Sequence, residues 1–524
     1  MKNLLFTLLA IAFLKTSSAQ TEQSTINFNT CSAIVSNSGT LFTDPVNFTA
    51  GYEYPKGSGK TLIYSSSFMF GATDVNGDTL LSSTTFQPDV ELFNGPHSAT
   101  NNYPTQISIW TMAKSDVDYH IANYSQPGYT LTARIEFWPG NGDALYGQNS
   151  NLAPFVDVNN NNIYEPLLGD YPDIRGDFAK YIIMNDSEKS HTNSNTAPLG
   201  IEVHLMFYQY TSSDYLDSTT FINMRVYNYS TNDYTDFVSS IFLDADIGYY
   251  ADDFLGCDST KNLVYGYNGD AFDENNGGGI GYGATPACLG IVSLNQDISS
   301  FLTYSGGSFF PYSIPSTKSG IWNVMHGKWQ DGTPIYYGGT GTAGSTGVTS
   351  TPTNFQYSGN PNSPGEWSEI NVNNPPGDRR AILSIKEANL PAGGSQCYDF
   401  AVIANMQSDN LTNVQNIYNI SDQVQSFYDN QNFNCNQVTV GIEENELNTF
   451  QVYPNPNEGV LNIKNRMTTN EIKITITDIS GRTVYQKQLD NKPIISLGFN
   501  QQPGSYFITI TSNNDSATKS IILK

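Results

Sequence analysis

Alternating apolar and polar positions run through most of the chain. Residues 201–211 show this period of two, which is typical of a strand with one buried face: the apolar positions are Ile201, Val203, Leu205 and Phe207, and the positions between them are Glu202, His204, Met206 and Tyr208. Residues 221–229 and 237–243 follow at hairpin spacing, with Ser, Thr, Asn and Asp between them. Helical spacing of apolar residues is clear over residues 411–429. The pattern predicts a mainly β, sandwich-like body with one late amphipathic helix.

A second, smaller β unit is predicted for the end of the chain. Ile472, Ile474 and Ile476 alternate with polar residues, and turn signals such as Pro503-Gly504 separate this run from the strands that follow. About seventy-five residues of this kind are enough for a small immunoglobulin-like β-sandwich. We therefore expect a β-rich body over residues 22–436, a linker at 437–448 and a C-terminal domain at 449–524.

The first residues predict export. Lys2 precedes an apolar run from residue 4 to residue 14, and small residues follow at 17–19. The run is too short to cross a bilayer and has the flanks of a secretory signal peptide, so residues 1–19 are expected to be removed by cleavage between Ala19 and Gln20. Because no later stretch reaches the length of a membrane helix, we expect no transmembrane segment in the mature chain.

Composition and charge narrow the classes of partner. The chain contains 33 Tyr and 28 Phe, which suits strands and argues against general disorder. Residues 20–440 hold 41 acidic and 14 basic side chains. Such a body repels phosphate backbones, so no nucleic acid partner is expected. The same carboxylates can bind hard cations, although acidity also serves solubility alone.

Five cysteines are present, and none of them lies in a Cys-x-x-Cys pair. This spacing argues against a thiolate zinc site or a thioredoxin-like redox pair. Passage through an oxidising compartment favours disulfides. Pairing within short stretches gives Cys257–Cys288 and Cys397–Cys435, although the sequence permits fifteen arrangements of two bridges and one free thiol.

Four short segments of the tail occur together in one order. They are an opening YPNP run with a later glycine, a D-I-S-G-R-x-V-Y segment, a G-S-Y turn and a basic terminus, and their key residues are Tyr453, Pro454, Asn455, Pro456, Gly459, Asp478, Gly481, Gly504 and Tyr506. The tail resembles the type A C-terminal sorting domain of the type IX secretion system. This resemblance implies a cargo protein of a Gram-negative bacterium, secreted or held at the outer cell surface, with the secretion machinery as its partner. An ordinary immunoglobulin-like domain is the alternative.

The body also contains familiar segments. Residues 169–172, 252–258, 331–334, 377–380 and 390–394 resemble parts of a recurrent secreted body found ahead of this sorting domain. That resemblance supports secretion and architecture and implies no reaction.

Residues 157–170 suggest a calcium loop. Asp157, Asn159 and Asn161 could supply three side-chain oxygens and Ile163 a backbone carbonyl, with Asp170 completing the shell. This stretch resembles a dockerin or thrombospondin-repeat calcium loop over its first seven residues, with Asn162 in place of the glycine that adopts the left-handed conformation. It departs from that pattern at the twelfth position, where Leu168 replaces an acidic ligand. The alternative is a polar turn.

A second acidic group contains Asp244, Asp246, Asp252 and Asp253, whose close carboxylates need a cation or a basic group between them. The alternative is a solvated acidic edge. Residues 74–78 are a weaker candidate of the same kind. The chain has no HExxH, GxSxG or P-loop motif.

These features favour a secreted or surface-attached structural or adhesive protein, stabilised by calcium, whose partner is an extracellular polymer or a cell-surface ligand. A secreted hydrolase of polysaccharide or protein, or a carbohydrate-binding protein, is the alternative.

Overall fold

A computed structural model shows two compact units, residues 1–435 and 436–524. The structure describes residues 22–524 apart from 87–89, 99–108, 277–278, 306–308, 388, 432, 434–449, 454–456, 458, 466–470, 479–481, 491, 493, 500 and 513–514. The predicted signal peptide with its cleavage site at Ala19 and Gln20, the linker at 437–448, and Cys435 lie outside the described residues. The predicted domain boundaries stay a proposal.

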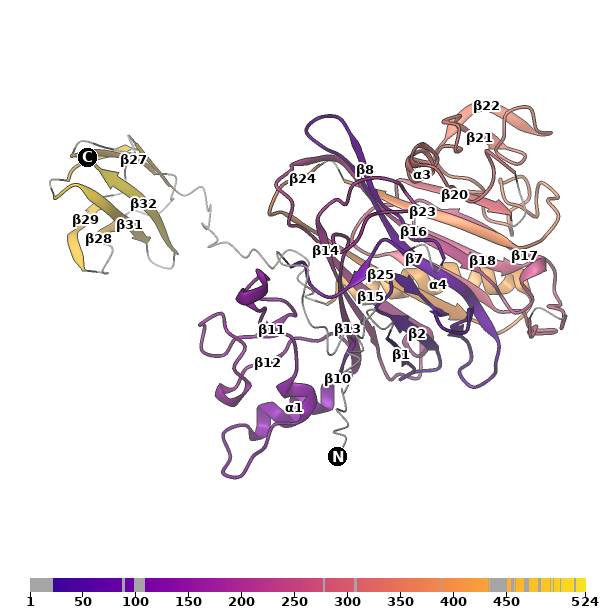
Figure 1. The fold of residues 1–524 in the computed structure, drawn as a ribbon, viewed down its shortest axis with the longest axis horizontal. Coiled ribbons are helices and arrows are strands. Elements are labelled where there is room, and N and C mark those ends of the chain that lie inside the picture. The colour runs from indigo at the N-terminus through magenta and orange to yellow at the C-terminus, as the bar shows by residue number, and fades with distance from the viewer. Residues whose placement is uncertain are drawn as a thin grey trace, which may run out of the picture. The chain divides into compact units, whose positions relative to one another are not determined.

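The body contains two large antiparallel sheets (Figure 1). We call the ten-stranded one sheet I. Its main path is β1 (Gln23–Ile26), β2 (Ser32–Ser36), β3 (Thr40–Leu41), β7 (Thr61–Thr73), β16 (Tyr234–Ala245), β23 (Arg379–Lys386) and β20 (Ser300–Ser305), and it is extended by β6 (Tyr52–Glu53), β8 (Thr79–Ser82) and β24 (Asn389–Leu390).

The nine-stranded sheet II faces sheet I. Its path is β10 (Ile109–Ala113), β13 (Phe178–Asn185), β14 (Ile201–Gln209), β15 (Thr219–Asn228), β25 (Ser395–Asn405), β19 (Cys288–Ser293), β18 (Leu263–Asn268) and β17 (Asp253–Asp258), with β9 (Phe93–Asn94) beside β13.

The main core lies between the two sheets. Phe68 and Phe70 of β7 and Val203, Leu205 and Phe207 of β14 belong to one buried cluster, because alternate residues of a strand share one face. The expected mainly β, sandwich-like fold is confirmed. Strand β14 departs from the expectation in being buried along its whole length, since helices and loops cover the outer face of sheet II as well.

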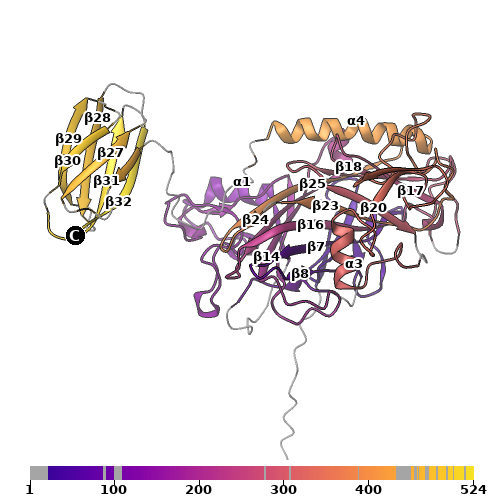
Figure 2. The ribbon, with the colours of Figure 1, turned by 90° about the horizontal axis from the view of Figure 1, so that it is seen from above.

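Two helices lie on opposite sides of the sandwich (Figure 2). The predicted late helix is α4 (Asn410–Asp429), which packs Val414, Ile417 and Val424 on the outer face of sheet II. Its first turn is capped by Asp409, whose side chain accepts from the backbone N–H of Thr412 at 3.0 Å. On the outer face of sheet I lies α3 (Lys318–Met325).

Shorter elements complete the body. They are α1 (Lys114–Asn123) and α2 (Ala133–Glu136), the strand pairs β4 (Thr43–Asp44) with β5 (Thr49–Ala50), β11 (Phe155–Val156) with β12 (Tyr171–Pro172) and β21 (Ile335–Gly338) with β22 (Val348–Thr353), and the 3-10 turns η1 (Ala144–Tyr146), η2 (Pro166–Leu168), η3 (Tyr215–Ser218) and η4 (Tyr250–Asp252). In the part of the chain that the structure describes, no helix is long and apolar enough to cross a membrane.

The C-terminal unit has a core of its own between two small sheets. One contains β26 (Phe450–Tyr453), β27 (Val460–Asn465) and β30 (Ile494–Gly498), and the other contains β29 (Thr483–Asp490), β28 (Glu471–Asp478), β31 (Gly504–Ser512) and β32 (Asp515–Leu523). Ile472, Ile474 and Ile476 are buried on one face of β28, as the alternation predicts.

The predicted Cys257–Cys288 disulfide is wrong. Both residues are buried free thiols. Cys257 on β17 belongs to the core between the sheets, whereas Cys288 on β19 belongs to the cluster on the outer face of sheet II. Strand β18 also lies between their strands, so two strand spacings of about 4.8 Å separate them, beyond the reach of a disulfide. Cys397 is disulfide-bonded, which leaves its predicted pairing with Cys435 as a prediction.

Candidate metal centre

The acidic centre arises from the register of two strands in sheet I. Asp244 near the end of β16 pairs with Arg380 near the start of β23, and Ala245 pairs with Arg379. The chain directions are opposite, so Asp246 and Asp378 are the next residues beyond these two strand ends. Since residues two apart on a strand share a face, Asp244, Asp246, Asp378 and Arg380 gather on the outer face of the sheet.

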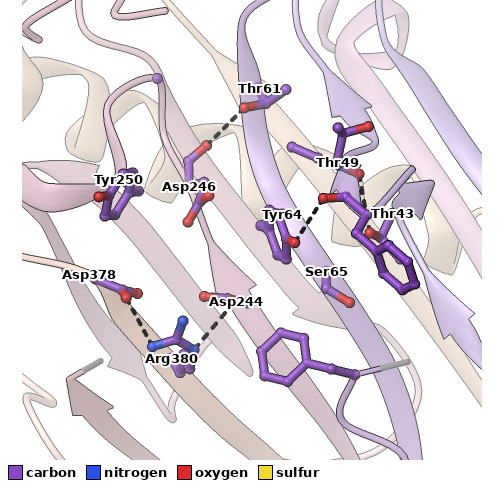
Figure 3. A pocket seen from close by; sticks show the side chains of 14 residues that line it. Thr43, Thr49, Thr61, Tyr64, Ser65, Asp244, Asp246, Tyr250, Asp378 and Arg380 are labelled. Atoms are coloured by element: carbon purple, nitrogen blue, oxygen red, sulfur yellow. Dashed lines mark hydrogen bonds and ion pairs between the residues drawn. The ribbon is translucent and has the colours of Figure 1, made fainter. Parts of the chain in front are cut away.

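Three carboxylates converge in this place. Asp244, Asp246 and Asp378 each offer an oxygen, and the three oxygens lie within 4.8 Å of one another. They line a cleft of about 640 Å³ (Figure 3), whose opposite wall includes Tyr64 and Ser65 of β7.

Arg380 is the positively charged partner of two of these carboxylates. Its Nη1 donates to Asp378 Oδ2 at 3.0 Å, and its Nε lies 3.3 Å from Asp244 Oδ2. Figure 3 shows Arg380 between these two aspartates. One guanidinium offsets only one of three negative charges when all three groups are ionised, so the cleft retains an excess of acidity.

Several buried oxygens in the cleft have no hydrogen-bond partner among the described residues. They are Asp244 Oδ1, Asp378 Oδ1 and Ser65 Oγ. Asp244 is 2% exposed and Ser65 is 1% exposed. Because an unpaired buried polar atom carries a desolvation cost, a ligand bound on this side of the cleft would offset that cost.

Burial also changes the acidity of the cleft. It raises the pKa of Asp244 to about 8, helped by the nearby Asp246 and opposed by Arg380. Burial and the charge of Asp378 raise the pKa of Asp246 to about 7. A divalent cation would favour the ionised forms that burial opposes. Three carboxylates in an open cleft are the kind of oxygen donor that calcium takes, so the residues present fit this ion.

The other two aspartates of the predicted cluster do not join this group. Asp252 belongs to η4, and Asp253 begins β17 in sheet II, because the chain crosses from one sheet to the other after Asp246. Asp253 is fully buried and accepts from the backbone N–H of Ile247 at 3.0 Å. Gly248 permits this crossing with a positive φ of 67°, and a Cβ there would lie 2.0 Å from Asp273 Oδ2.

The loop at 157–170 folds as a set of turns held by side-chain oxygens. Asp157 Oδ2 accepts from Asn162 N at 2.6 Å, and the Oδ1 atoms of Asn159 and Asn161 accept from the backbone two residues later. Asn162 has the expected positive φ, 60°.

Asp170 is fully buried and closes the same loop. Its two oxygens accept from the backbone N–H groups of Val158 and Glu165 at 2.9 and 2.8 Å. Asp157 Oδ1 is buried and without a hydrogen-bond partner among the described residues. The carboxylate of Glu165, which the sequence analysis did not select, lies 2.5 Å from Asn161 Nδ2.

Asp378 and Arg380 are members of the centre that were not predicted from the sequence. They lie more than 130 residues after Asp244 and come close to it only through the pairing of β16 with β23. The Asp-x-Arg spacing after Pro375-Pro376-Gly377 was the available signal, because it places both side chains on one face at the start of a strand.

Comparison with solved structures adds little about the body. A polysaccharide lyase aligns at 8% identity and a TM-score of 0.19, over 62% of this chain and 34% of its own. The chain thus spans about a third of that protein, and a likeness this weak carries no argument. No curated protein matches the chain.

The C-terminal unit holds the residues of the predicted sorting motif. Of these motif residues, Pro454, Asn455, Pro456 and Gly481 lie outside the described residues. Tyr453 ends β26, and Gly459 has a positive φ of 98°. Asp478 accepts from the backbone N–H of Arg482 at 3.1 Å, and Tyr506, two residues after Gly504, packs edge-on against Phe499.

The model of the secretion system C-terminal sorting domain matches residues 451–524. These residues are therefore a sorting domain of the type IX secretion system, and the protein is exported by that machinery to the outside of a Gram-negative cell.

Proposed function

We propose that the body is a calcium-binding structural or adhesive protein of the cell exterior, and that the acidic cleft holds the cation. The observation that carries this proposal is Asp244, whose buried Oδ1 has no hydrogen-bond partner in the described part of the chain while two further carboxylates converge on the same cleft. A cation there joins the end of β16 to the start of β23 and the loop that leads to η4. Such a bond stabilises the folded body by mass action.

Calcium suits the cleft better than magnesium. Calcium accepts six to eight oxygens in flexible arrangements, whereas magnesium demands an octahedron and keeps several waters. The described lining of the cleft includes three carboxylates and the hydroxyls of Thr43, Thr61 and Ser65. The loop at 157–170 is a second candidate on the same grounds, with Asp157, Asn159, Asn161 and the Ile163 carbonyl as ligands.

A binding role fits this cleft better than catalysis by a histidine-activated nucleophile. Among the described residues, its lining includes neither histidine nor cysteine, so a side-chain nucleophile such as Ser65 has no imidazole beside it. The three buried histidines of the described residues are engaged elsewhere. His120 contacts the Tyr129 hydroxyl and the Asp170 carbonyl, His204 contacts Glu202 and Tyr181, and His191 contacts two backbone carbonyls. Turnover of a polysaccharide or protein by the purified chain would overturn this choice.

Calorimetric titration of the full chain with calcium tests the proposal. We expect a dissociation constant of about 0.1–1 mM, as in other extracellular calcium modules, for the cleft. Asp246→Asn keeps the shape of the side chain and should remove this binding. The matched control is Asp422→Asn on α4, an exposed aspartate paired with Lys261, which should bind calcium as the parent does. Unchanged titration of Asp246→Asn would contradict the proposal.

A further inference from the structure

A second cleft, of about 510 Å³, adjoins the acidic cleft. Asp378 lines both of them, and the second one extends over the start of β23 towards β20 and the segment that follows α3. Four aromatic side chains contribute to its wall: Tyr304, Tyr312, Trp329 and Tyr357. We call it the aromatic cleft. Its volume lies within the range of about 300–1,000 Å³ that small-molecule sites have.

The charged groups of the aromatic cleft each have an ionic partner. Arg379 forms a buried ion pair with Glu369, with Nη2 2.9 Å from Oε2, and its Nη1 donates to Ser305 Oγ at 2.9 Å. Asp378, which the cleft shares with the acidic cleft, is paired with Arg380. Away from Asp378, the described lining therefore presents hydroxyls, amides, aromatic faces and one internally compensated ion pair.

Besides Asp378 Oδ1, the hydroxyl of Tyr304 in this wall is unpaired among the described residues. Tyr304 is 4% exposed, and its hydroxyl has no hydrogen-bond partner among the described residues. Tyr304 pairs across the sheet with Arg380, which in turn pairs with Asp244, so its ring stands at the boundary between the two clefts. A ligand hydroxyl in the aromatic cleft would satisfy this buried group.

The aromatic side of the cleft also reaches the surface. Tyr312 is 37% exposed and meets Trp329 edge-on, with ring centroids 4.8 Å apart. Near it along the chain, Phe309 and Phe310 are 87% and 65% exposed. Tyr312 therefore offers a ligand in the cleft an aromatic surface that solvent can reach.

We propose that the aromatic cleft binds a sugar residue of a neutral extracellular glycan. This inference rests on the proposed adhesive function and names its ligand. A sugar ring has apolar C–H faces, which suit the exposed ring of Tyr312 held against the buried Trp329, and hydroxyls, which suit Tyr304 and the polar lining. Neutral glycans are favoured because the acidic body repels polyanions.

The test begins with the purified full chain on an array of neutral oligosaccharides (β-glucan, xylan, mannan and galactan hexamers) and acidic ones (oligogalacturonate and alginate). The strongest ligand is then titrated calorimetrically against variants. Tyr312→Ala should weaken binding about tenfold, as truncation of an aromatic anchor does. Tyr304→Phe, which removes only the hydroxyl, should weaken it about fivefold, the value of one hydrogen bond. The control Tyr119→Ala removes a tyrosine on α1 that is 55% exposed and should change nothing.

Three outcomes would overturn the inference: no binding by the folded chain, binding of acidic oligosaccharides alone, or unchanged affinity in both Tyr312→Ala and Tyr304→Phe. Thermal melting of each variant separates lost binding from lost folding. Calcium titration of the same preparation separates the two proposals. Calcium binding without glycan binding contradicts the glycan inference alone, whereas glycan binding without calcium binding contradicts the calcium proposal alone.

Discussion

The acidic cleft and the loop at 157–170 both gather oxygen atoms, but they differ in what their own backbone supplies. In the loop, Asp157, Asn159, Asn161 and Asp170 each accept from a backbone N–H group of the same segment. In the cleft, the partner of the carboxylates is Arg380, and Asp244 Oδ1 has none among the described residues. The loop can thus hold its shape without a cation, whereas the carboxylates of the cleft ionise together readily only when a further positive charge joins Arg380. Calcium should therefore matter more to the cleft.

Removing Arg380 should give the largest effect. Arg380→Gln leaves three neighbouring carboxylates without their counter-charge, and loss of one partner of a buried ion pair costs about 3 kcal/mol. Calcium should restore most of this free energy of unfolding by replacing the positive charge. Urea unfolding of the full chain with chelator or with calcium measures both values through tryptophan emission, because all five tryptophans lie in the body.

The matched control is Lys386→Gln, on the same strand as Arg380. It breaks a partly exposed pair with Asp236 of β16 and should cost less than about 0.5 kcal/mol. An equal loss of stability for Arg380→Gln with and without calcium would remove the distinction between cleft and loop.

Calcium affinity of the cleft should rise with pH. The pKa values of Asp244 and Asp246, raised to about 8 and about 7, mean that these groups hold protons which a cation must displace. Between pH 6 and pH 8 the affinity should increase about tenfold or more. The free energy of unfolding without calcium should change with pH in the opposite direction. In chelator the folded state binds more protons than the unfolded chain, so stability falls as pH rises from about 4 through 8.

Calorimetric titrations at pH 6, 7 and 8 measure the first effect, and urea unfolding in chelator over the same range measures the second. Asp244→Asn removes one of the two titrating groups and should flatten both profiles. An affinity that does not change with pH would contradict the raised pKa values.

Removing a proposed ligand from the loop at 157–170 should change the stability of the body least. Asp157→Ala removes its first proposed ligand and should lower calcium stoichiometry by one. At calcium about tenfold above the dissociation constant, one site contributes about 1.4 kcal/mol, which is about 2 °C of melting temperature in a body of this size.

The control for this variant is Asp214→Ala, an exposed aspartate whose side chain accepts from the backbone N–H of Leu216 at 3.0 Å in another turn. Its calcium stoichiometry should stay that of the parent. If Asp157→Ala keeps the parent stoichiometry and chelator sensitivity, the loop is a polar turn.

Local patterns predicted the features that depend on neighbouring residues. Alternation over 201–211 predicted β14, and helical spacing predicted α4 to within one residue at its start. The Asp-x-Asn-x-Asn spacing predicted a tight loop with Asn162 in the left-handed region. In each case the cause is short-range: the pleat of a strand, the turn of a helix, or a side chain that accepts from a backbone group two to five residues away.

The same reasoning failed where strand register decides which residues meet. Asp253 is only nine residues after Asp244 but lies on the other sheet, whereas Asp378 is distant in sequence and lies beside it. Cys257 and Cys288 are on opposite faces of one sheet for the same reason. Register follows from the packing of whole strands against a common core, and no short stretch of sequence records it.

An anomalous difference map of crystals soaked in manganese, a calcium substitute that scatters anomalously, would locate the cation in the body. We expect a peak within about 2.0–2.6 Å of carboxylate oxygens from Asp244, Asp246 and Asp378, displaced by excess calcium. A map with peaks elsewhere and none in the acidic cleft would contradict this expectation.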